Sequence, residues 1–174
     1  MANLNVPGLI TAFYGRLSFL KNRTQWAKGI VCFGVVFGAL AWAKGYVGLL
    51  YSPTGSLPHH LFLHLKQVEP KKGDYACVAS SWYGGMLVKE IAGTTGDALS
   101  YDAAGNLWVG RQLRVGKPKK KAKDGRTLTP IKPGVIPEGM AFVRGSHERS
   151  FDSRYEELGL VPKRHLRGRA IALL

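Results

Sequence analysis

Two segments of the sequence carry residue types that together could form an activated nucleophile. Residues 52–58, reading SPTGSLP, are rich in turn-forming residues and present the hydroxyls of Thr54 and Ser56 on one short loop. Residues 86–92, reading MLVKEIA, place Lys89 among aliphatic side chains on one face of a predicted strand. A serine hydroxyl needs an adjacent base before it becomes a good nucleophile, and a neutral lysine amine can be that base.

Lys89 can act as a base only if its surroundings lower its pKa. Burial disfavours the ammonium form, and a fall in the pKa from about 10.4 to about 8 corresponds to roughly 3 kcal/mol of differential interaction. Strand alternation points Glu90 to the opposite face, so its carboxylate is not expected to stabilise the charge. Lys89 is therefore either at a sheet edge with its amine reaching water or buried for a functional reason. If it is buried and neutral, it can act as a base toward a serine hydroxyl, the part that histidine plays in a Ser-His-Asp triad.

The elements that must position these residues are predicted to be strands. After residue 61 the sequence consists of short apolar or alternating runs separated by proline and glycine. Residues 102–106 predict a hairpin connection, and residues 153–156, reading SRYE, have the form of a capping box and predict a helix start. We expect a mainly β, antiparallel, barrel-like or sandwich-like architecture with strands in the runs LFLHL, YACVAS, MLVKEIAG, ALSY, NLWVGRQL, MAFVRG and RAIALL.

The composition fits one folded domain with a strongly positive surface. The chain has 174 residues, 45% of them hydrophobic and 21% charged, which excludes a two-domain enzyme, a wholly disordered chain and a multi-span membrane protein. The net charge of +14, part of it in a basic loop at residues 114–126, favours an anionic partner. Cys32 and Cys77 lie in unlike segments and form no C-x-x-C pair, so neither a disulfide nor a zinc ribbon is expected.

The N-terminal part predicts one membrane crossing. The apolar run at residues 29–51 would extend about 34 Å as a helix, enough for one bilayer, and only Lys44 interrupts it. No acidic residue precedes the run, whereas four basic residues do: Arg16, Lys21, Arg23 and Lys28. The positive-inside rule therefore places the N-terminus in the cytoplasm and everything after Tyr51 outside it.

Three parts of the chain follow from this topology. Residues 1–28 form a cytoplasmic tail whose apolar spacing is typical of an interfacial amphipathic helix. Residues 29–51 form a transmembrane signal anchor, and residues 52–174 form a β-rich domain outside. Two alternatives remain open: a signal peptide cleaved after Ala43, and a buried core helix, which the preceding cations disfavour.

Four motifs, in chain order, resemble those of the type I signal peptidase family of Ser-Lys membrane proteases. The family's Pro-Ser-Gly-Ser-Met-x-Pro-like loop resembles residues 53–58, and its Lys-Gly-Asp turn resembles residues 72–74. Its lysine strand, ending in Gly-x-x-Gly-Asp, resembles residues 88–97, and its late Ser-x-Asp-Ser-Arg motif matches residues 150–154. The resemblance runs from about residue 53 to residue 161 and implies the mainly β signal peptidase fold.

Departures from the family pattern narrow the resemblance. Leu57 stands where leader peptidases usually carry methionine, residues 145–149 replace most of the Gly-Asp-Asn-Arg lead-in, and the chain is short with one span. These features are similar to the TraF-type peptidases of conjugative plasmids, which mature a pilin precursor. The resemblance implies a single-pass protein of the bacterial inner membrane with a periplasmic catalytic domain. Its implied partners are propilin, or another membrane-inserted precursor, and the membrane lipids.

The resemblance also implies a role for each matched residue. Ser56 would attack the scissile carbonyl to form an acyl-enzyme, with Lys89 as general base and later as general acid. The Ser56 backbone N–H and the Thr54 hydroxyl would hold the oxyanion. We call residues 145–154, which contain the late motif, the late loop. Three supporting residues would orient Lys89 or hold the late loop against the site: Ser150, Asp152 and Arg154.

Other functions remain open beside pilin maturation. A general type I signal peptidase would use the same residues, and the acyl-enzyme could be resolved by water or by the pilin's own amino terminus, which would give a cyclic product. A non-catalytic, membrane-anchored basic module of a secretion or conjugation apparatus fits the net charge and the lysines of residues 117–123. Nucleic acid is not expected as a partner on the outer side. No cofactor and no metal are expected, because the histidines of residues 59–64 lie on a predicted strand without an adjacent glutamate.

Overall fold

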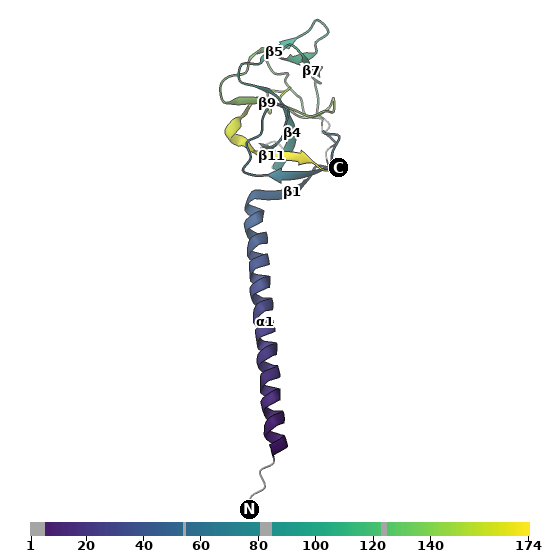
Figure 1. The fold of residues 1–174 in the computed structure, drawn as a ribbon. Helices are drawn as coiled ribbons and strands as arrows, with labels where there is room; N and C mark the ends of the chain where they lie inside the picture. Colours follow the sequence, from purple (N-terminus) through teal and green to yellow (C-terminus); the bar gives the residue numbers. More distant parts are fainter. Residues whose placement is uncertain (1–5, 54, 81–84, 123–124) are drawn as a thin grey trace, which may run out of the picture. The chain divides into compact units, whose positions relative to one another are not determined.

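The computed structural model describes residues 6–53, 55–80, 85–122 and 125–174. The chain divides into two units, Met1–Gly45 and Tyr46–Leu174, and each is considered by itself. The first unit holds α1 (Val6–Tyr46), drawn in purple and blue in Figure 1, and the second holds all the strands.

Helix α1 runs without a break from the predicted cytoplasmic tail into the predicted transmembrane span. Within it, Gln25–Tyr46 is long and apolar enough to cross a membrane, and this stretch is not buried against other parts of the chain that the structure describes. The helix ends at Tyr46 rather than at Tyr51, because residues Val47–Tyr51 form a strand, β1, whose backbone pairs with β2 (Leu61–Leu65). The C-terminal boundary expected for the helical anchor is therefore too late.

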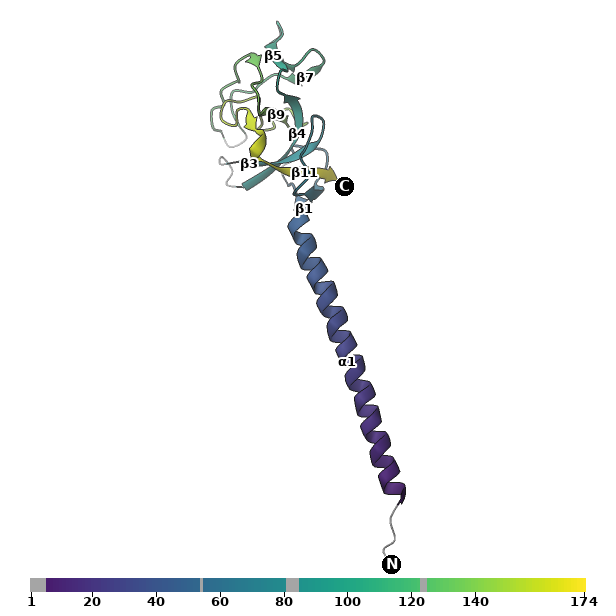
Figure 2. The same ribbon diagram turned by 60° about the vertical axis from the view of Figure 1, so that its left-hand side comes forward.

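The second unit consists of two antiparallel sheets. The larger sheet has the order β1, β2, β11 (Leu166–Ala172), β3 (Tyr75–Ser80), β4 (Gly85–Thr94), β9 (Met140–Arg144) and β10 (Val161–Pro162). The smaller sheet has the order β7 (Leu113–Gly116), β6 (Leu107–Val109), β5 (Ala98–Tyr101) and β8 (Gly134–Val135). Figures 1 and 2 agree in placing β5 and β7 at the opposite end of this unit from β1 and β11. The mainly β, antiparallel fold class is confirmed.

Two details of the predicted elements are wrong. The run NLWVGRQL forms two strands, β6 and β7, because the chain turns at Gly110, whose φ of 63° suits glycine. No α-helix begins at Ser153; its hydroxyl accepts a hydrogen bond from the Val143 N–H of β9 at 3.0 Å instead of capping a helix. The segment after it pairs with another loop through an isolated bridge between Pro130 and Tyr155. A short 3-10 helix, Lys163–His165, precedes β11.

Strand β4 is an inner strand of the larger sheet. It pairs with β3 on one side and with β9 on the other, so its middle residues are covered by neighbouring strands. A buried cluster that includes Ala92, Val109 and Phe142 packs the far end of β4 and β9 against the smaller sheet. Lys89 therefore lies on a strand that is paired on both sides, and it is buried.

Two turns that match family motifs fix the register of β4 just beyond Lys89. The Ile91 carbonyl accepts a hydrogen bond from the Gly73 N–H at 2.8 Å, and the Ile91 N–H donates to the Asp74 carbonyl at 2.9 Å. An ion pair of 2.7 Å between Lys72 and Asp97 joins the two turns. These motif residues lie outside the candidate site, and their contribution to it is to fix the position of β4.

Candidate active site

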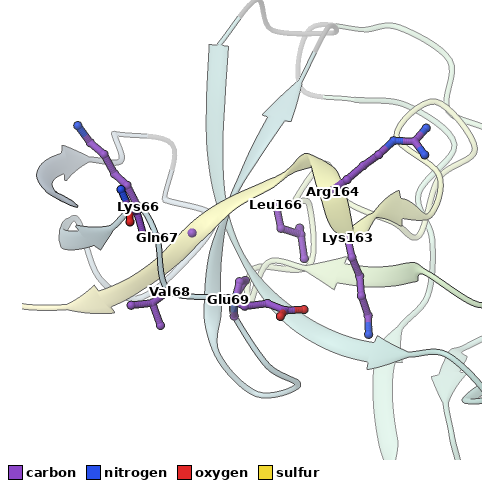
Figure 3. A pocket seen from close by; sticks show the side chains of 9 residues that line it. Lys66, Gln67, Val68, Glu69, Lys163, Arg164 and Leu166 are labelled. Atoms are coloured by element: carbon purple, nitrogen blue, oxygen red, sulfur yellow. The ribbon is translucent and has the colours of Figure 1, made fainter. Parts of the chain in front are cut away.

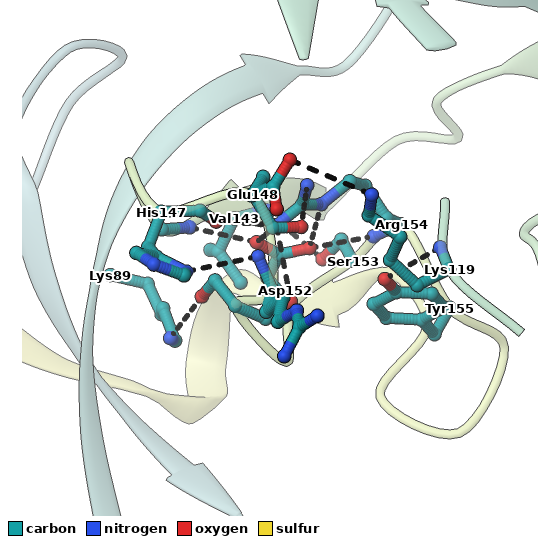
Figure 4. Close-up of polar contacts among 12 residues, drawn as sticks. Lys89, Lys119, Val143, His147, Glu148, Asp152, Ser153, Arg154 and Tyr155 are labelled. Carbon is teal, nitrogen blue, oxygen red and sulfur yellow. Dashed lines mark hydrogen bonds and ion pairs between the residues drawn. The ribbon is translucent and has the colours of Figure 1, made fainter. Parts of the chain in front are cut away.

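Lys89 is a buried base that points toward the late loop. Its side chain is 2% exposed, and its Nζ donates a hydrogen bond to the Ser150 Oγ at 2.8 Å. Figure 4 shows this contact at the edge of a network of polar side chains. Burial lowers the pKa of Lys89 to about 8; the charge of Asp152 opposes the fall and that of Arg154 adds to it. Near neutral pH a useful fraction of this amine is unprotonated.

The segment that carries Ser56 is held by the side chain that follows it. Leu57 is buried in a cluster with Phe62, Cys77 and Ala170 and with Val88, the residue before Lys89. Because Leu57 packs against β3 and β4, the backbone of Ser56 cannot move away from these strands without exposing apolar surface. Ser56 is itself buried, and the residue before it, Gly55, has a φ of 58°, a conformation that favours glycine.

The loop around Ser56 is closed at its base by two contacts. The Ser52 N–H donates to the His60 carbonyl at 2.8 Å, and the His60 Nδ1 lies 3.0 Å from the Ser52 carbonyl. A loop whose ends are joined in this way, and whose middle is anchored by Leu57, holds its serine in a fixed place. The closing role of His60 has no signal in the sequence, where it reads as an ordinary strand-face histidine.

Gly145 lies where the Ser56 loop meets Ser150, which is bonded to Lys89. A Cβ added there would lie 2.6 Å from the Ser150 Cβ and 2.7 Å from the Ser56 carbonyl oxygen, closer than real Cβ contacts. The neighbouring His147 N–H donates to the same Ser56 carbonyl at 3.3 Å. A side chain at position 145 would thus collide with the Ser56 loop and with Ser150, so only glycine can fill this position. Ser150 in turn connects the position to the amine of Lys89.

Asp152 and Arg154 form a buried ion pair behind Ser150. Their side chains are 0% and 1% exposed, and the Arg154 Nε donates to the Asp152 Oδ1 at 2.8 Å. Asp152 also accepts a hydrogen bond from the Gly145 N–H at 2.9 Å. The pair therefore fixes the backbone of Gly145, and through it the contact between the late loop and the Ser56 loop.

Arg154 ties the late loop together from within. Its guanidinium donates to three backbone carbonyls, and Figure 4 shows it at the centre of this network: His147 at 3.1 Å, Glu148 at 2.9 Å and Ser150 at 3.1 Å. Its outer side is covered by the Tyr155 ring, whose centroid lies 5.9 Å from the Arg154 Cζ. A lysine could not make these contacts, because they need the planar fork of a guanidinium.

The structure brings most of the predicted site residues into one place. Lys89 and Ser150 are hydrogen bonded, Ser56 lies against the same glycine as Ser150, and Asp152 and Arg154 support the late loop. Thr54, predicted to share the oxyanion, lies outside the described residues. Of the two alternatives for Lys89, an edge position and burial, the structure shows burial.

Sequence reasoning missed three contributors to the site: Gly145, His147 and Tyr155. Gly145 and His147 belong to the GSHER segment, which the sequence treats as a departure from the family pattern, so the only available signal is the glycine before the late motif. Among the residues that the structure describes, no three His, Cys, Asp or Glu side chains gather as a metal site. A pocket of about 330 Å³ lies elsewhere and includes Lys66, Lys163 and Arg164, and Figure 3 shows their charged groups pointing in different directions.

The arrangement contains the parts of a serine acylation site: a hydroxyl on a fixed loop and a buried amine with a lowered pKa. Residues 23–174 match the sequence profile of the family described as signal peptidase, peptidase S26, so the chain belongs to that family. Membership of this family supports serine peptidase activity.

Two further comparisons complete this result. No curated protein matches the chain. Among solved structures, a signal peptidase I from Enterococcus faecalis is 24% identical, with a TM-score of 0.38, over 60% of this chain and 97% of that one.

Proposed function

We propose that this protein is a membrane-anchored serine endopeptidase with a Ser56-Lys89 dyad that cleaves a membrane-inserted precursor protein. The observation that carries the proposal is the buried amine of Lys89, held by Ser150 beside the Ser56 loop, with its pKa lowered to about 8. A buried lysine with no carboxylate bonded to it is costly unless its neutral form is used.

The proposed reaction has two halves. The Ser56 hydroxyl attacks the scissile carbonyl while Lys89 takes its proton, and the C–N bond then breaks as Lys89 gives that proton to the leaving amine. In the second half, neutral Lys89 takes a proton from the incoming nucleophile as it attacks the acyl carbonyl, and Lys89 then gives that proton to the Ser56 oxygen as the ester C–O bond breaks. The oxyanion is held by the Ser56 backbone N–H and the Thr54 hydroxyl, by the resemblance to the family's first motif.

For localisation, we propose that the helix of Gln25–Tyr46 is a transmembrane anchor in a bacterial inner membrane, with a cytoplasmic N-terminus and a periplasmic peptidase domain. The length and apolar composition of the helix and the basic, acid-free segment before it support this orientation. Because Ser56 follows the anchor closely in the sequence, a scissile bond near the membrane surface is the expected target.

For the substrate, we propose a conjugative pilin precursor, as in TraF-type peptidases. The short late-loop lead-in at residues 145–149 and Leu57 at the methionine position support this choice. Water or the pilin's own amino terminus could resolve the acyl-enzyme, giving a linear or a cyclic product. A general signal peptidase is equally consistent with the family, and a non-catalytic basic module is the alternative of another class.

One experiment separates these functions. Propilin and a general secretory precursor are each co-expressed with wild-type protein and with Ser56→Ala, and the products are weighed by mass spectrometry. We expect processing of propilin only, and only by wild type; a product lighter by one water than the linear chain would identify cyclisation. Processing of both precursors would favour the general signal peptidase, and processing by Ser56→Ala would reject the dyad.

A further inference from the structure

The described residues on either side of positions 123–124 in the lysine-rich segment pair with each other. The Ala122 N–H donates to the Arg126 carbonyl at 2.9 Å, and the Leu128 N–H donates to the Lys120 carbonyl at 2.9 Å. An antiparallel bridge joins Lys121 and Thr127 between these bonds. We call the described residues 117–122 and 125–128 the basic hairpin. Its lysines are displayed on a backbone of defined shape, so they can act together on a ligand.

The basic hairpin is anchored on the segment that builds the candidate active site. Leu128 is buried with Phe151 and Tyr155, and Ala122 packs against the same cluster. In addition, the Lys119 N–H donates to the Tyr155 hydroxyl at 3.1 Å. Phe151 and Tyr155 flank the Asp152–Arg154 pair in the sequence, so the basic hairpin and the late loop share one core cluster. A ligand held by the hairpin is therefore held beside the late loop.

Three lysines of the basic hairpin have exposed charges without a carboxylate partner among the described residues: Lys117, Lys120 and Lys121. Lys119 makes one weak contact, 3.5 Å from Glu148, and both side chains are exposed.

We propose that the basic hairpin is a docking site for an acidic segment of the polypeptide substrate, outside the residues next to the scissile bond. This inference rests on the proposed peptidase function and adds a determinant of substrate choice. Separate, exposed lysine ammonium groups close together in the sequence suit several carboxylates on an extended chain. The anchoring on the late loop favours a polypeptide that is also engaged at Ser56 over a ligand bound independently of the reaction.

Docking of this kind changes how substrate arrives rather than how the bond breaks. Complementary charge accelerates encounter and lowers KM, and the effect is screened by salt, whereas groups around Lys89 determine kcat. The expected signature is therefore a KM difference between acidic and neutral substrates that disappears at high ionic strength.

The test compares two cleavable peptides that differ only in a block of four glutamates distant from the scissile bond. Full-length protein in neutral detergent micelles is used as wild type, as Lys117→Gln/Lys120→Gln/Lys121→Gln, and as the control Lys163→Gln/Arg164→Gln, which removes basic charge at the pocket of Figure 3. We expect the triple variant to raise KM for the glutamate peptide about tenfold with kcat unchanged. The neutral peptide and the control variant should show no change, and 0.5 M salt should remove the difference.

Equal behaviour of the two peptides, or an equal loss in the control variant, would overturn the proposal. Vesicles with and without anionic lipid give a second arm: if the triple substitution abolishes binding to anionic vesicles and leaves both peptides unaffected, the hairpin binds lipid and the proposal is wrong. Binding of both peptides to the Ser56→Ala variant, measured by fluorescence anisotropy, tests the docking site separately from the peptidase activity. Preferential binding of the glutamate peptide without cleavage by wild type would support the docking site and reject the peptidase.

Discussion

At the scale of single residues, the amine of Lys89 is the group on which the proposed chemistry depends most. Its neutral form has a lone pair for the Ser56 proton, and its ammonium form has none. Burial supplies the neutral form by lowering the pKa to about 8, and the hydrogen bond to Ser150 fixes the direction of the amine. The pH therefore controls how much of the protein is competent.

The pH dependence of the reaction follows from the sign of this shift. Because the base form of Lys89 accumulates as the pH rises through about 8, kcat/KM should rise between about pH 7 and 9 and then level off. Lys89→Arg should be inactive throughout this range, since a guanidinium does not lose its proton. Initial rates on a neutral peptide check both statements; a rate that is flat from pH 6 to 9 would contradict the assignment of Lys89 as the base.

Gly145 gives a second prediction at this scale. In Gly145→Ala the new methyl group meets the Ser150 Cβ and the Ser56 carbonyl, so one of these segments must shift. A displacement of about 1 Å at a reacting group can cost about 10²-fold, and we expect kcat/KM to fall by at least this factor.

The matched control for Gly145→Ala is Gly85→Ala, at a strand glycine with open space around its Cβ position. The control should retain its activity, and circular dichroism should show both variants folded. Full activity in Gly145→Ala would show that the close contact of Gly145 with the Ser56 loop and Ser150 is unimportant.

At the scale of elements, the strands that carry Lys89 could be predicted from alternation and the late loop could not. β4 is long, apolar and central, so its local pattern and its place in the sheet agree. The SRYE sequence at residues 153–156 predicts a helix by local rules, but two side chains there have partners distant in the sequence. Ser153 bonds to β9 and Tyr155 to the basic hairpin, and these contacts override the local capping preference.

The ion pair within the late loop makes a prediction about stability. Asp152→Asn or Arg154→Met should each lower the free energy of unfolding by about 3–5 kcal/mol, because each leaves the other charge buried and unpaired. The double variant should lose less free energy of unfolding than the two single variants lose together. Denaturant unfolding of the detergent-solubilised protein measures all three values.

An exposed ion pair serves as the control for this cycle. Lys132 and Glu156 lie 3.7 Å apart on the surface, and Lys132→Met should change the free energy of unfolding by less than about 1 kcal/mol. Strict additivity of Asp152→Asn and Arg154→Met would contradict the coupling between the two buried side chains.

At the scale of the whole molecule, the division into an apolar helix and a β unit could be predicted from the sequence, but the position of the boundary could not. Residues 45–51 are apolar throughout, so hydropathy alone continues the span through residues 47–51. These residues alternate in exposure as β1, and their backbone is satisfied by β2, which composition does not reveal. Three segments come together at the candidate site: residues 52–58, 86–92 and 145–154. Their proximity likewise depends on the order of the strands in the sheet, which cannot be predicted from local sequence patterns.

The membrane anchor makes a prediction at this scale. Val36→Arg places a charge near the middle of the Gln25–Tyr46 helix and should cost about 2.5–3.5 kcal/mol of insertion free energy. The share of the chain that stays with membranes after an alkaline wash should therefore fall. Val68→Arg, at a partly exposed valine of the β unit, should leave that share unchanged. Equal membrane retention of the two variants would contradict the role of this helix as an anchor.

The most direct test of the central claim is to trap the acyl-enzyme. Wild-type protein is mixed with an activated ester of a short peptide, quenched in acid, digested and analysed by mass spectrometry. We predict the mass of the acyl group on the peptide that contains Ser56, and its absence in both Ser56→Ala and Lys89→Ala. An acyl group on a different residue, or an undiminished adduct at Ser56 in Lys89→Ala, would contradict the Ser56-Lys89 dyad.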